Sequence, residues 1–365
     1  MNTIKALVVD DTIVYRKIVG DALKQMPGIE VVGTANNGKI ALSKIKTLKP
    51  DLMTLDIEMP EMNGIELLQQ LQHMESPPLV IMVSTLTHQG GELTLKALEL
   101  GAFDVLPKPE EGTMAENMLK VKKNLEPIVR HIKRHKFGII ASPARSKPAV
   151  PGTARVRSPK AVSRPTQSKP TGIRSKSEII GIGISTGGPN ALTKMIPMLP
   201  KNFKVPILIV QHMPPVFTAS LANSLNKKSA LEVLEAKDGD TIKPGKVFIA
   251  PGGKQMKVVA GADGLTRKIK ITDDPPENSC KPSADYLFRS IAQHYVGRST
   301  GVIMTGMGSD GSKGLVQMKN NGSVIIAQDE KTCTVYGMPK EPTESGIVDV
   351  IAPLEKIADE IVKTV

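Results

Sequence analysis

Apolar and amphipathic segments alternate along the first 126 residues. Five short apolar segments predict β-strands, at residues 4–9, 30–34, 52–55, 79–83 and 104–106. Amphipathic segments predict helices near residues 14–26, 38–48, 64–74, 91–100 and 117–135. Strands that are apolar on both faces are typical of a parallel sheet covered by helices on both sides. The pattern predicts a doubly wound α/β domain over residues 1–126.

The same alternation returns over residues 178–365. Strands are predicted in the segments EIIGIGIS, VPILIVQH, KVFIAPG, GVIMTG and SVIIAQ, and a hairpin around GADGLTRK. Helices are predicted from about residues 189, 216, 312 and 353, and through ADYLFRSIAQHY. We therefore expect a second α/β domain, Rossmann-like, with a mostly parallel sheet.

The segment between the two domains, residues 127–177, has a different composition. It holds 13 Lys and Arg and no Asp or Glu, so the net charge of +12 arises there. It is rich in Pro and Ser, and such a composition cannot bury enough apolar surface to fold. We predict the end of a helix followed by a flexible, basic linker. A nucleic-acid-binding arm is the alternative, but residues 142–177 contain no aromatic side chain that could stack on bases.

Cysteine content and hydropathy bear on where the protein resides. The chain has two cysteines, Cys280 and Cys333, and it begins with MNTIKALVVDD rather than a signal-peptide pattern. No apolar run approaches the roughly 20 residues that a membrane helix needs. We expect a cytoplasmic protein with no structural disulfide and no membrane insertion.

Polar side chains follow four of the strands predicted in the first domain. They are Asp10 and Asp11, Asp56, Ser84 and Lys108. The carboxyl ends of parallel strands form one edge of a sheet, where ligands bind. Crowded carboxylates need a counter-ion, and Mg²⁺ prefers oxygen ligands from carboxylates and phosphate. Asp56 could then attack a phosphoryl donor, while Lys108 holds a phosphate oxygen.

These residues resemble the receiver domain of bacterial response regulators, whose fold is flavodoxin-like. The resemblance rests on Asp10-Asp11, on LDIEMPEMNG and on GAFDVLPKP. It implies that Asp56 is the phosphoacceptor and that a sensor histidine kinase is the donor. It also implies a Mg²⁺ site formed by the acidic cluster (Asp10, Asp11 and Asp56) and the backbone carbonyl of Glu58. Strand length favours Ser84 over Thr85 as the residue that follows the new phosphate.

A candidate nucleophile follows the first strand of the second domain. Ser185 lies in the segment GIGISTGGP, which fits the G-x-S-x-G turn that exposes a serine hydroxyl between a strand and a helix. A dinucleotide-binding loop is the competing interpretation. However, position 186 is Thr where that motif has glycine, and the next strand ends in His212 rather than an acidic residue.

His212 and Asp310 complete a possible catalytic set. His212 follows the strand VPILIVQH, where a general base for Ser185 is expected, and Asp310 follows the strand GVIMTG in a glycine-rich loop. Each residue lies after a separate strand, and triads are recognised by role and geometry rather than chain order. We predict acyl transfer with Ser185 as nucleophile, His212 as base and Asp310 as the residue that orients the imidazole.

Six blocks of the second domain resemble the catalytic domain of the chemotaxis protein-glutamate methylesterases, a family of response regulators. They are IGISTGGPNAL, VQHMPPVFTASLA, KVFIAPGG, KPSADYLF, IMTGMGSDGSKGL and AQDEKTCTVYGMPKE. The resemblance implies phosphorylation-activated hydrolysis of methyl-glutamate esters on the cytoplasmic domains of chemoreceptors, with release of methanol. The activity that the resemblance implies often includes deamidation of receptor glutamines. Two departures, Gln255 where the family often has His and Lys281 where Arg is common, affect substrate contacts.

Several further expectations follow. The oxyanion hole should use backbone N–H groups near Thr186, Gly187, Gly188 and Met307, and the ester chemistry should need no cofactor. We expect a monomer that does not bind nucleic acid. Two rival functions are a DNA-binding response regulator, which would need a helix-turn-helix, and a nicotinamide-dependent oxidoreductase, which would bind a nucleotide.

Overall fold

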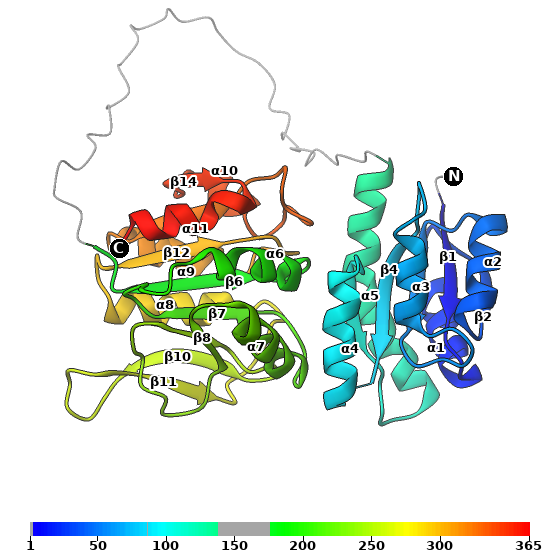
Figure 1. The fold of residues 1–365 in the computed structure, drawn as a ribbon, viewed down its shortest axis with the longest axis horizontal. Coiled ribbons are helices and arrows are strands. Elements are labelled where there is room, and N and C mark those ends of the chain that lie inside the picture. The colour runs from blue at the N-terminus through cyan, green and yellow to red at the C-terminus, as the bar shows by residue number, and fades with distance from the viewer. Residues whose placement is uncertain (1–2, 86, 138–175) are drawn as a thin grey trace, which may run out of the picture.

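The computed structural model describes residues 3–85, 87–137 and 176–365. Figure 1 shows two α/β domains side by side, each built from a sheet with helices on both faces. The predicted flexible linker lies largely outside the described residues. Its first part, up to Phe137, is helical and continues the last helix of the N-terminal domain.

The N-terminal domain alternates strands and helices as the hydrophobic pattern predicts. The strands are β1 Ile4–Val9, β2 Ile29–Ala35, β3 Leu52–Asp56, β4 Leu79–Ser84 and β5 Asp104–Pro107. The helices are α1 Ile13–Lys24, α2 Gly38–Leu48, α3 Gly64–Leu71, α4 His88–Glu99 and α5 Met114–Phe137. Predicted and observed bounds differ by a few residues, most at α5, where the helix begins and ends outside the amphipathic segment.

All five strands of the N-terminal sheet are parallel, in the order β2-β1-β3-β4-β5. The chain crosses from one side of β1 to the other after β2, so the end of β1 is the point where the winding direction reverses. Ligands bind at such points in open α/β sheets. Asp10 follows β1, and Asp56 ends the neighbouring strand β3.

The C-terminal domain contains a seven-stranded parallel sheet and a separate hairpin. The sheet strands are β6 Ile179–Ile184, β7 Ile207–Gln211, β8 Glu232–Glu235, β9 Lys246–Ile249, β12 Ser299–Ile303, β13 Val324–Gln328 and β14 Val350–Ala352. The hairpin pairs β10 Gln255–Ala260 with β11 Arg267–Thr272, as predicted. The helices are α6 Gly188–Met195, η1 Ile196–Met198, α7 Phe217–Lys228, α8 Ala284–His294, α9 Ser312–Asn320, α10 Lys340–Glu344 and α11 Leu354–Lys363.

The order of the large sheet is β14-β13-β12-β6-β7-β9-β8. Strand β6 therefore lies between β12 and β7, and the winding reverses beside it. The three predicted catalytic residues follow these three adjacent strands. The strands missed by the sequence pattern, β8 and β14, lie at the two edges of the sheet. Each has only three or four residues and is partly exposed, so neither forms an apolar run.

Helix α4 of the N-terminal domain packs against α6 and α7 of the C-terminal domain, as Figure 1 shows. Asn190 in α6 donates a hydrogen bond of 2.7 Å to the carbonyl of Leu98 in α4. Gly91 lets the helices approach closely, because a Cβ at this position would lie 2.5 Å from Ser220 Oγ in α7. The apolar residues on one face of the N-terminal sheet and one face of the C-terminal sheet are thereby joined into one cluster, while the other face of each sheet belongs to a cluster of its own.

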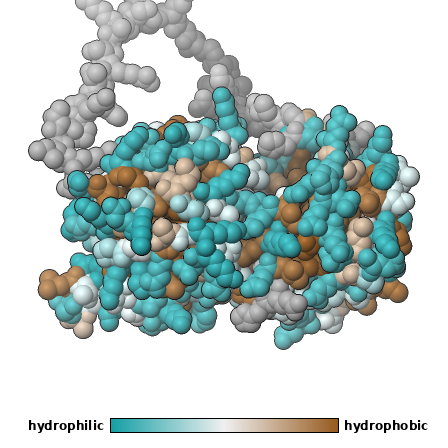
Figure 2. Space-filling view, in the orientation of Figure 1, coloured by the Kyte–Doolittle hydropathy of each residue, from teal (hydrophilic) through white to brown (hydrophobic). Residues whose placement is uncertain are grey.

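The face of the molecule drawn in Figure 2 is mainly polar. Figure 2 shows hydrophilic residues over most of this face of both domains, with apolar residues in small groups between them. None of the helices in the described part of the chain is both long and apolar enough to cross a membrane.

Candidate functional site

The residues predicted at the strand ends of the N-terminal domain lie together. Carboxylate oxygens of Asp10, Asp11 and Asp56 are within 4.8 Å of one another. The Lys108 ammonium lies 2.8 Å from Asp10 Oδ2 and 2.7 Å from Asp56 Oδ2. One buried lysine thus provides the positive charge for two buried carboxylates.

This cluster contains more negative than positive charge, and the pKa values of its members reflect the imbalance. Burial raises the pKa of Asp56 to about 6, although Lys108 acts in the opposite direction. Burial also raises the pKa of Asp10. For Lys108, burial favours the neutral amine, but the hydrogen bonds to Asp10 and Asp56 outweigh it and raise the pKa of the ammonium. A second cation would relieve the remaining repulsion.

A cavity of about 260 Å³ opens beside Asp56. It is lined by Asp11, Thr12, Tyr15, Asp56, Ile57, Glu58, Ser84, Thr85, Gly90 and Lys108. Except for Asp10, which does not line this cavity, the predicted metal, phosphate and switch residues therefore gather around one space. Tyr15 was not predicted. Its ring lies 4.7 Å from Lys108 Nζ and its hydroxyl donates to the Pro109 carbonyl, so it holds the lysine from a third side.

Ser185 lies at the turn between β6 and α6. Its backbone N–H donates to Thr305 after β12, and its carbonyl accepts from the Gly188 N–H at 2.7 Å. Gly187 adopts a φ of 78°, and a Cβ there would lie 2.3 Å from Thr334 Oγ1. Only glycine fits this tight turn, as the G-x-S-x-G pattern predicts.

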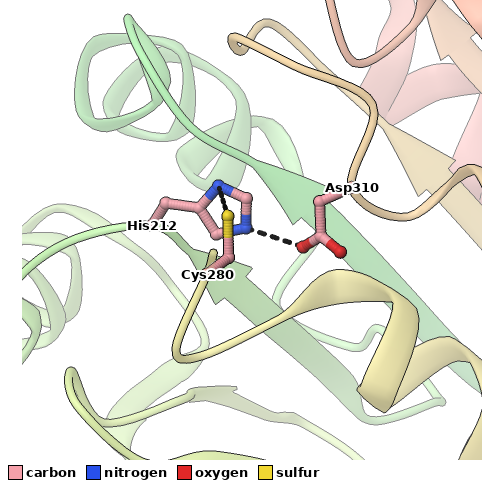
Figure 3. Close-up of side chains that lie close together, drawn as sticks. All are labelled: His212, Cys280 and Asp310. Carbon is pink, nitrogen blue, oxygen red and sulfur yellow. Dashed lines mark hydrogen bonds and ion pairs between the residues drawn. The ribbon is translucent and has the colours of Figure 1, made fainter. Parts of the chain in front are cut away.

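His212 and Asp310 are joined directly. His212 follows β7, and its backbone N–H donates to Ile184 at the end of β6. Its Nε2 lies 2.9 Å from Asp310 Oδ2, as Figure 3 shows. The carboxylate is buried and the imidazole largely so, with 13% of its side chain exposed. His212 and Asp310, the predicted base and its predicted orienting acid, are thus brought together.

Asp310 is surrounded by donors that the sequence did not identify. Its Oδ1 accepts hydrogen bonds from Asn278 Nδ2, Ser283 Oγ and the Asp285 N–H, and its Oδ2 accepts from the Ala284 N–H. The carboxylate therefore caps the N-terminus of α8, where the helix dipole favours negative charge. Burial alone would raise the pKa of Asp310, but the hydrogen bonds, led by that from His212, lower it to about 2.

The other ring nitrogen of His212 faces Cys280. Sγ of Cys280 lies 3.7 Å from His212 Nδ1, and Figure 3 shows this contact at the ring nitrogen that does not face Asp310. Burial favours the neutral imidazole, but Asp310 and Cys280 outweigh it and raise the pKa of His212. No hydrogen bond joins Ser185 and His212 in the described part of the chain. The structure thus assembles two of the three predicted catalytic residues and places the third on the adjacent strand end.

Candidate oxyanion donors lie around Ser185. The Gly188 N–H is already used by the Ser185 carbonyl. Within the described residues, the backbone N–H groups of Thr186, Gly187 and Met307 make no hydrogen bond. Thr186 and Gly187 directly follow Ser185 before α6, where backbone donors favour developing negative charge. Met307 follows Gly306, where a Cβ would lie 2.7 Å from Ser185 Cβ.

The N-terminal domain reaches this site. Thr186, next to Ser185, donates from Oγ1 to Oδ2 of Asp104 in β5 at 2.7 Å. Burial raises the pKa of Asp104, although the bond from Thr186 opposes this. Met307 packs against the apolar cluster of the N-terminal domain. Thr186 and Met307 therefore both contact the N-terminal domain.

The two departures noted in the sequence have structural roles. Gln255 is fully buried, donates to the Pro275 carbonyl and accepts from the Ser283 N–H at 2.8 Å. Lys281 Nζ donates to the Asp273 carbonyl. Both side chains hold the segment before α8 in place, and with it the residues that surround Asp310.

Comparisons with known proteins agree with the two domains. Residues 6–120 match the response regulator receiver domain family, and residues 180–361 match the CheB methylesterase family. The chain is 55% identical over 366 aligned positions to "Protein-glutamate methylesterase/protein-glutamine glutaminase" of Desulfotalea psychrophila, covering 100% of this chain and 99% of that protein. It is 44% identical to the Bacillus subtilis protein of the same name, covering 99% and 98%.

A solved structure matches the C-terminal domain. The crystal structure of the Thermotoga maritima CheB methylesterase catalytic domain shares 42% identity and a TM-score of 0.50, covering 52% of this chain and 99% of that one. Matched from end to end by its relatives, the chain belongs to the receiver-linked CheB methylesterase family.

Proposed function

We propose that this protein hydrolyses methyl esters of glutamate side chains on chemoreceptors and converts receptor glutamines to glutamate, under the control of phosphorylation at Asp56. The names of the full-length relatives support the two activities. The observation that carries the catalytic assignment is the His212–Asp310 hydrogen bond at strand ends adjacent to Ser185.

In the proposed reaction Ser185 Oγ attacks the side-chain carbonyl of the substrate. His212 accepts the hydroxyl proton at Nδ1, because Nε2 is held by Asp310. The negative charge that develops on the carbonyl oxygen is stabilised by backbone N–H groups near Thr186, Gly187 and Met307. Asp310 remains ionised throughout and stabilises the imidazolium that forms.

The second half of the reaction reverses these roles. His212 returns the proton to the leaving group, which departs as methanol from an ester or as ammonia from an amide. Water then attacks the acyl-serine and His212 accepts a proton from it. His212 returns this proton to Ser185 Oγ as the acyl bond breaks, so glutamate is released and Ser185 is regenerated. Since no hydrogen bond joins Ser185 and His212 in the described residues, a side-chain rotation must precede the first step.

Methanol release tests the proposal directly. Purified protein would be incubated with receptors carrying labelled methyl groups, with and without a small-molecule phosphodonor. We expect volatile label to appear, faster with phosphodonor, and ammonia to appear from glutamine-containing receptors. No methanol release by phosphorylated protein would contradict the esterase function.

The acidic cluster is the proposed Mg²⁺ site. Asp10 Oδ2 is buried with no partner among the described residues other than Lys108, and the three carboxylates offer oxygen ligands at close spacing. Asp11, Asp56 and the Glu58 carbonyl would hold the cation, with Asp10 beside them. Bound Mg²⁺ would neutralise the incoming phosphoryl group. Asp56 would then receive that group, Lys108 would pair with one of its oxygens, and Ser84 would donate a hydrogen bond to another.

Contacts between the domains support regulation by docking. The receiver domain supplies Asp104 to the residue beside Ser185 and places α4 against α6 and α7. In this arrangement the receiver covers one side of the catalytic site. Phosphorylation at Asp56 would draw Ser84 inward and shift α4, which begins four residues later, releasing the site.

The proposed partners follow from the two domains. A sensor histidine kinase would supply the phosphoryl group, and the cytoplasmic domains of methylated chemoreceptors would be the substrate. We further propose a cytoplasmic monomer that does not bind nucleic acid. Electrophoretic mobility of DNA and sedimentation of the purified protein would test the last two points.

A further inference from the structure

A rigid turn holds the thiol of Cys280 beside the imidazole of His212. The turn spans Glu277–Cys280 and is closed by backbone hydrogen bonds in both directions, of 3.1 and 2.7 Å. Its central residues, Asn278 and Ser279, have φ of 51° and 64°. This backbone presents the cysteine in one orientation.

Side chains fix the turn at both ends. Asn278 Nδ2 donates to both Asp285 and Asp310, and Glu277 forms an ion pair with Arg289 in α8. After the turn, Lys281 is held by Asp273. These contacts fix the backbone of Cys280 beside His212, and from there its Sγ lies 3.7 Å from Nδ1.

The three groups lie in the order thiol, imidazole, carboxylate (Figure 3). Cysteine nucleophiles are activated by this order of groups, because the imidazole accepts the thiol proton and the carboxylate stabilises the imidazolium. Cys280 is also partly exposed, so small reagents can reach it.

A metal site formed by the same three residues is less favourable. The two oxygens of Asp310 already accept hydrogen bonds from five groups, including His212. A cation would have to displace several of these donors to gain a carboxylate ligand. The arrangement therefore suits a reactive thiol better than a metal site.

We propose that Cys280 is a peroxide-sensitive thiol whose oxidation removes His212 from catalysis. The thiolate attacks one oxygen of a hydroperoxide, an S–O bond forms and the O–O bond breaks. The departing oxygen takes the proton held by His212, so hydrogen peroxide yields cysteine sulfenic acid and water while sulfur loses two electrons.

Oxidation places an oxygen atom between sulfur and Nδ1, the ring nitrogen that Ser185 needs. This step rests on the proposed role of His212 as base, whereas the reactivity of the thiol does not. The second cysteine is also only partly buried, but burial raises the pKa of Cys333 to about 12, so its thiol stays protonated and unreactive at neutral pH. Reversal would come from a small-molecule thiol.

Alkylation rates test the thiol, and Cys333 serves as the internal reference. Full-length protein kept in chelator would be treated with iodoacetamide, and both cysteines quantified by peptide mass spectrometry. We expect Cys280 to react at least about tenfold faster than Cys333. His212→Gln and His212→Asn should both slow Cys280, while Ser185→Ala should not. Equal rates at the two cysteines, or a Cys280 rate independent of residue 212, would overturn the proposal.

Peroxide treatment tests the consequence. A 1,3-diketone trap should label Cys280 after brief exposure to hydrogen peroxide, and methanol release should fall about fivefold or more and recover with dithiothreitol. Cys280→Ser, compared with its own untreated rate, should be insensitive, and Cys333→Ser should respond like wild type. Equal inhibition of Cys280→Ser would overturn the link to catalysis. The untreated wild-type rate reports separately on the esterase function.

Discussion

The two sites of this protein treat a buried aspartate in opposite ways. Asp56 shares one ammonium with Asp10, and burial raises its pKa to about 6. Asp310 is equally buried, but five donors surround it and its pKa is lowered to about 2. Both residues follow parallel strands at the carboxyl edge of a sheet.

This difference shows that burial alone does not define the role of a carboxylate. Asp56 lies in a cluster that lacks positive charge, which suits a site that receives a cation and a phosphoryl group. Asp310 has its hydrogen bonds completed by the fold, which suits a group that stays ionised and orients an imidazole. Substitutions at and around the two residues should therefore have different effects.

The largest expected effect is on hydrolysis. Ser185→Ala, His212→Gln and the double variant should all lose methanol release to a similar floor, about 10⁴-fold or more below wild type, because the groups act as a unit. Rates would be measured with phosphodonor present. Gly20→Ala is the matched control, since a Cβ at Gly20 meets no atom within 4 Å. Substantial activity in His212→Gln would show that the base has been wrongly assigned.

A second expected effect separates the two sites. Asp56→Asn should accept no phosphoryl group from a small-molecule phosphodonor, because an amide is not a nucleophile for this reaction. Ser185→Ala should be labelled like wild type. Labelling would be followed with radioactive phosphodonor, with and without Mg²⁺. Undiminished labelling in excess chelator would argue against the metal site, and labelling of Asp56→Asn would argue against the phosphoacceptor.

The cluster of polar residues at the carboxyl edge of the N-terminal sheet could be predicted from sequence almost entirely. Asp10, Asp56, Ser84 and Lys108 each directly follow or end a strand, and parallel strands bring their carboxyl ends to one edge. Tyr15 was missed because it lies within a helix and acts through its ring and hydroxyl on residues about 90 positions away.

The catalytic site could be predicted only in part. The strand-end rule places Ser185, His212 and Asp310, but the donors to Asp310 come from residues 278–285, a loop and helix start with no strand register to fix them. Ser283 as a helix N-cap was a detectable signal, since it directly precedes the helical pattern. The position of Cys280 depends on two residues with positive φ, which hydrophobic patterns do not reveal.

Replacing each aspartate by asparagine should change the free energy of unfolding in opposite directions. Asp310→Asn should lower it. Asp310 has a folded-state pKa of about 2, below the unfolded value of 3.8, so its ionisation stabilises the fold above pH 3.8. Asp310→Asn should lower the free energy of unfolding of the catalytic domain by about 2 kcal/mol at neutral pH. In wild type this contribution should fade as the pH falls from 3.8 to 2. Calorimetry of both proteins would measure it, and an unchanged melting temperature would contradict it.

Asp56→Asn should instead stabilise the receiver domain in chelator. The folded-state pKa of about 6 lies above 3.8, so the ionised form costs free energy at neutral pH. The gain should be about 1–3 kcal/mol at pH 7 to 8. It should shrink as the pH falls from 6 to 4, where wild-type Asp56 becomes protonated. Added Mg²⁺ should stabilise wild type more than the variant, and a less stable variant in chelator would contradict the charge shortage.

The smallest expected effect concerns the contact between the domains. A side chain at Gly91 would clash with Ser220, since a Cβ there would lie 2.5 Å from its hydroxyl oxygen. Gly91→Val should therefore weaken docking of α4 on α7 and raise methanol release without phosphodonor by about two- to tenfold, an effect on the scale of about 0.4–1.4 kcal/mol. Because the receiver is tethered, it acts as an intramolecular ligand, and inhibition should be partial.

The same contact predicts how the variant responds to phosphorylation. Phosphodonor should stimulate Gly91→Val less than wild type, since part of the release has already occurred, and both should reach a similar final rate. Asp104→Ala removes the hydrogen-bond acceptor for Thr186 elsewhere in the contact between the domains. Phosphodonor should stimulate this variant less than wild type as well. The fragment lacking residues 1–177 should show the highest rate of methanol release without phosphodonor, because it has no receiver domain to cover its site. If that fragment were no faster than the intact, unphosphorylated protein, docking would not inhibit the enzyme. Phosphorylation would then have to act by activating the site or by bringing the protein to its receptors.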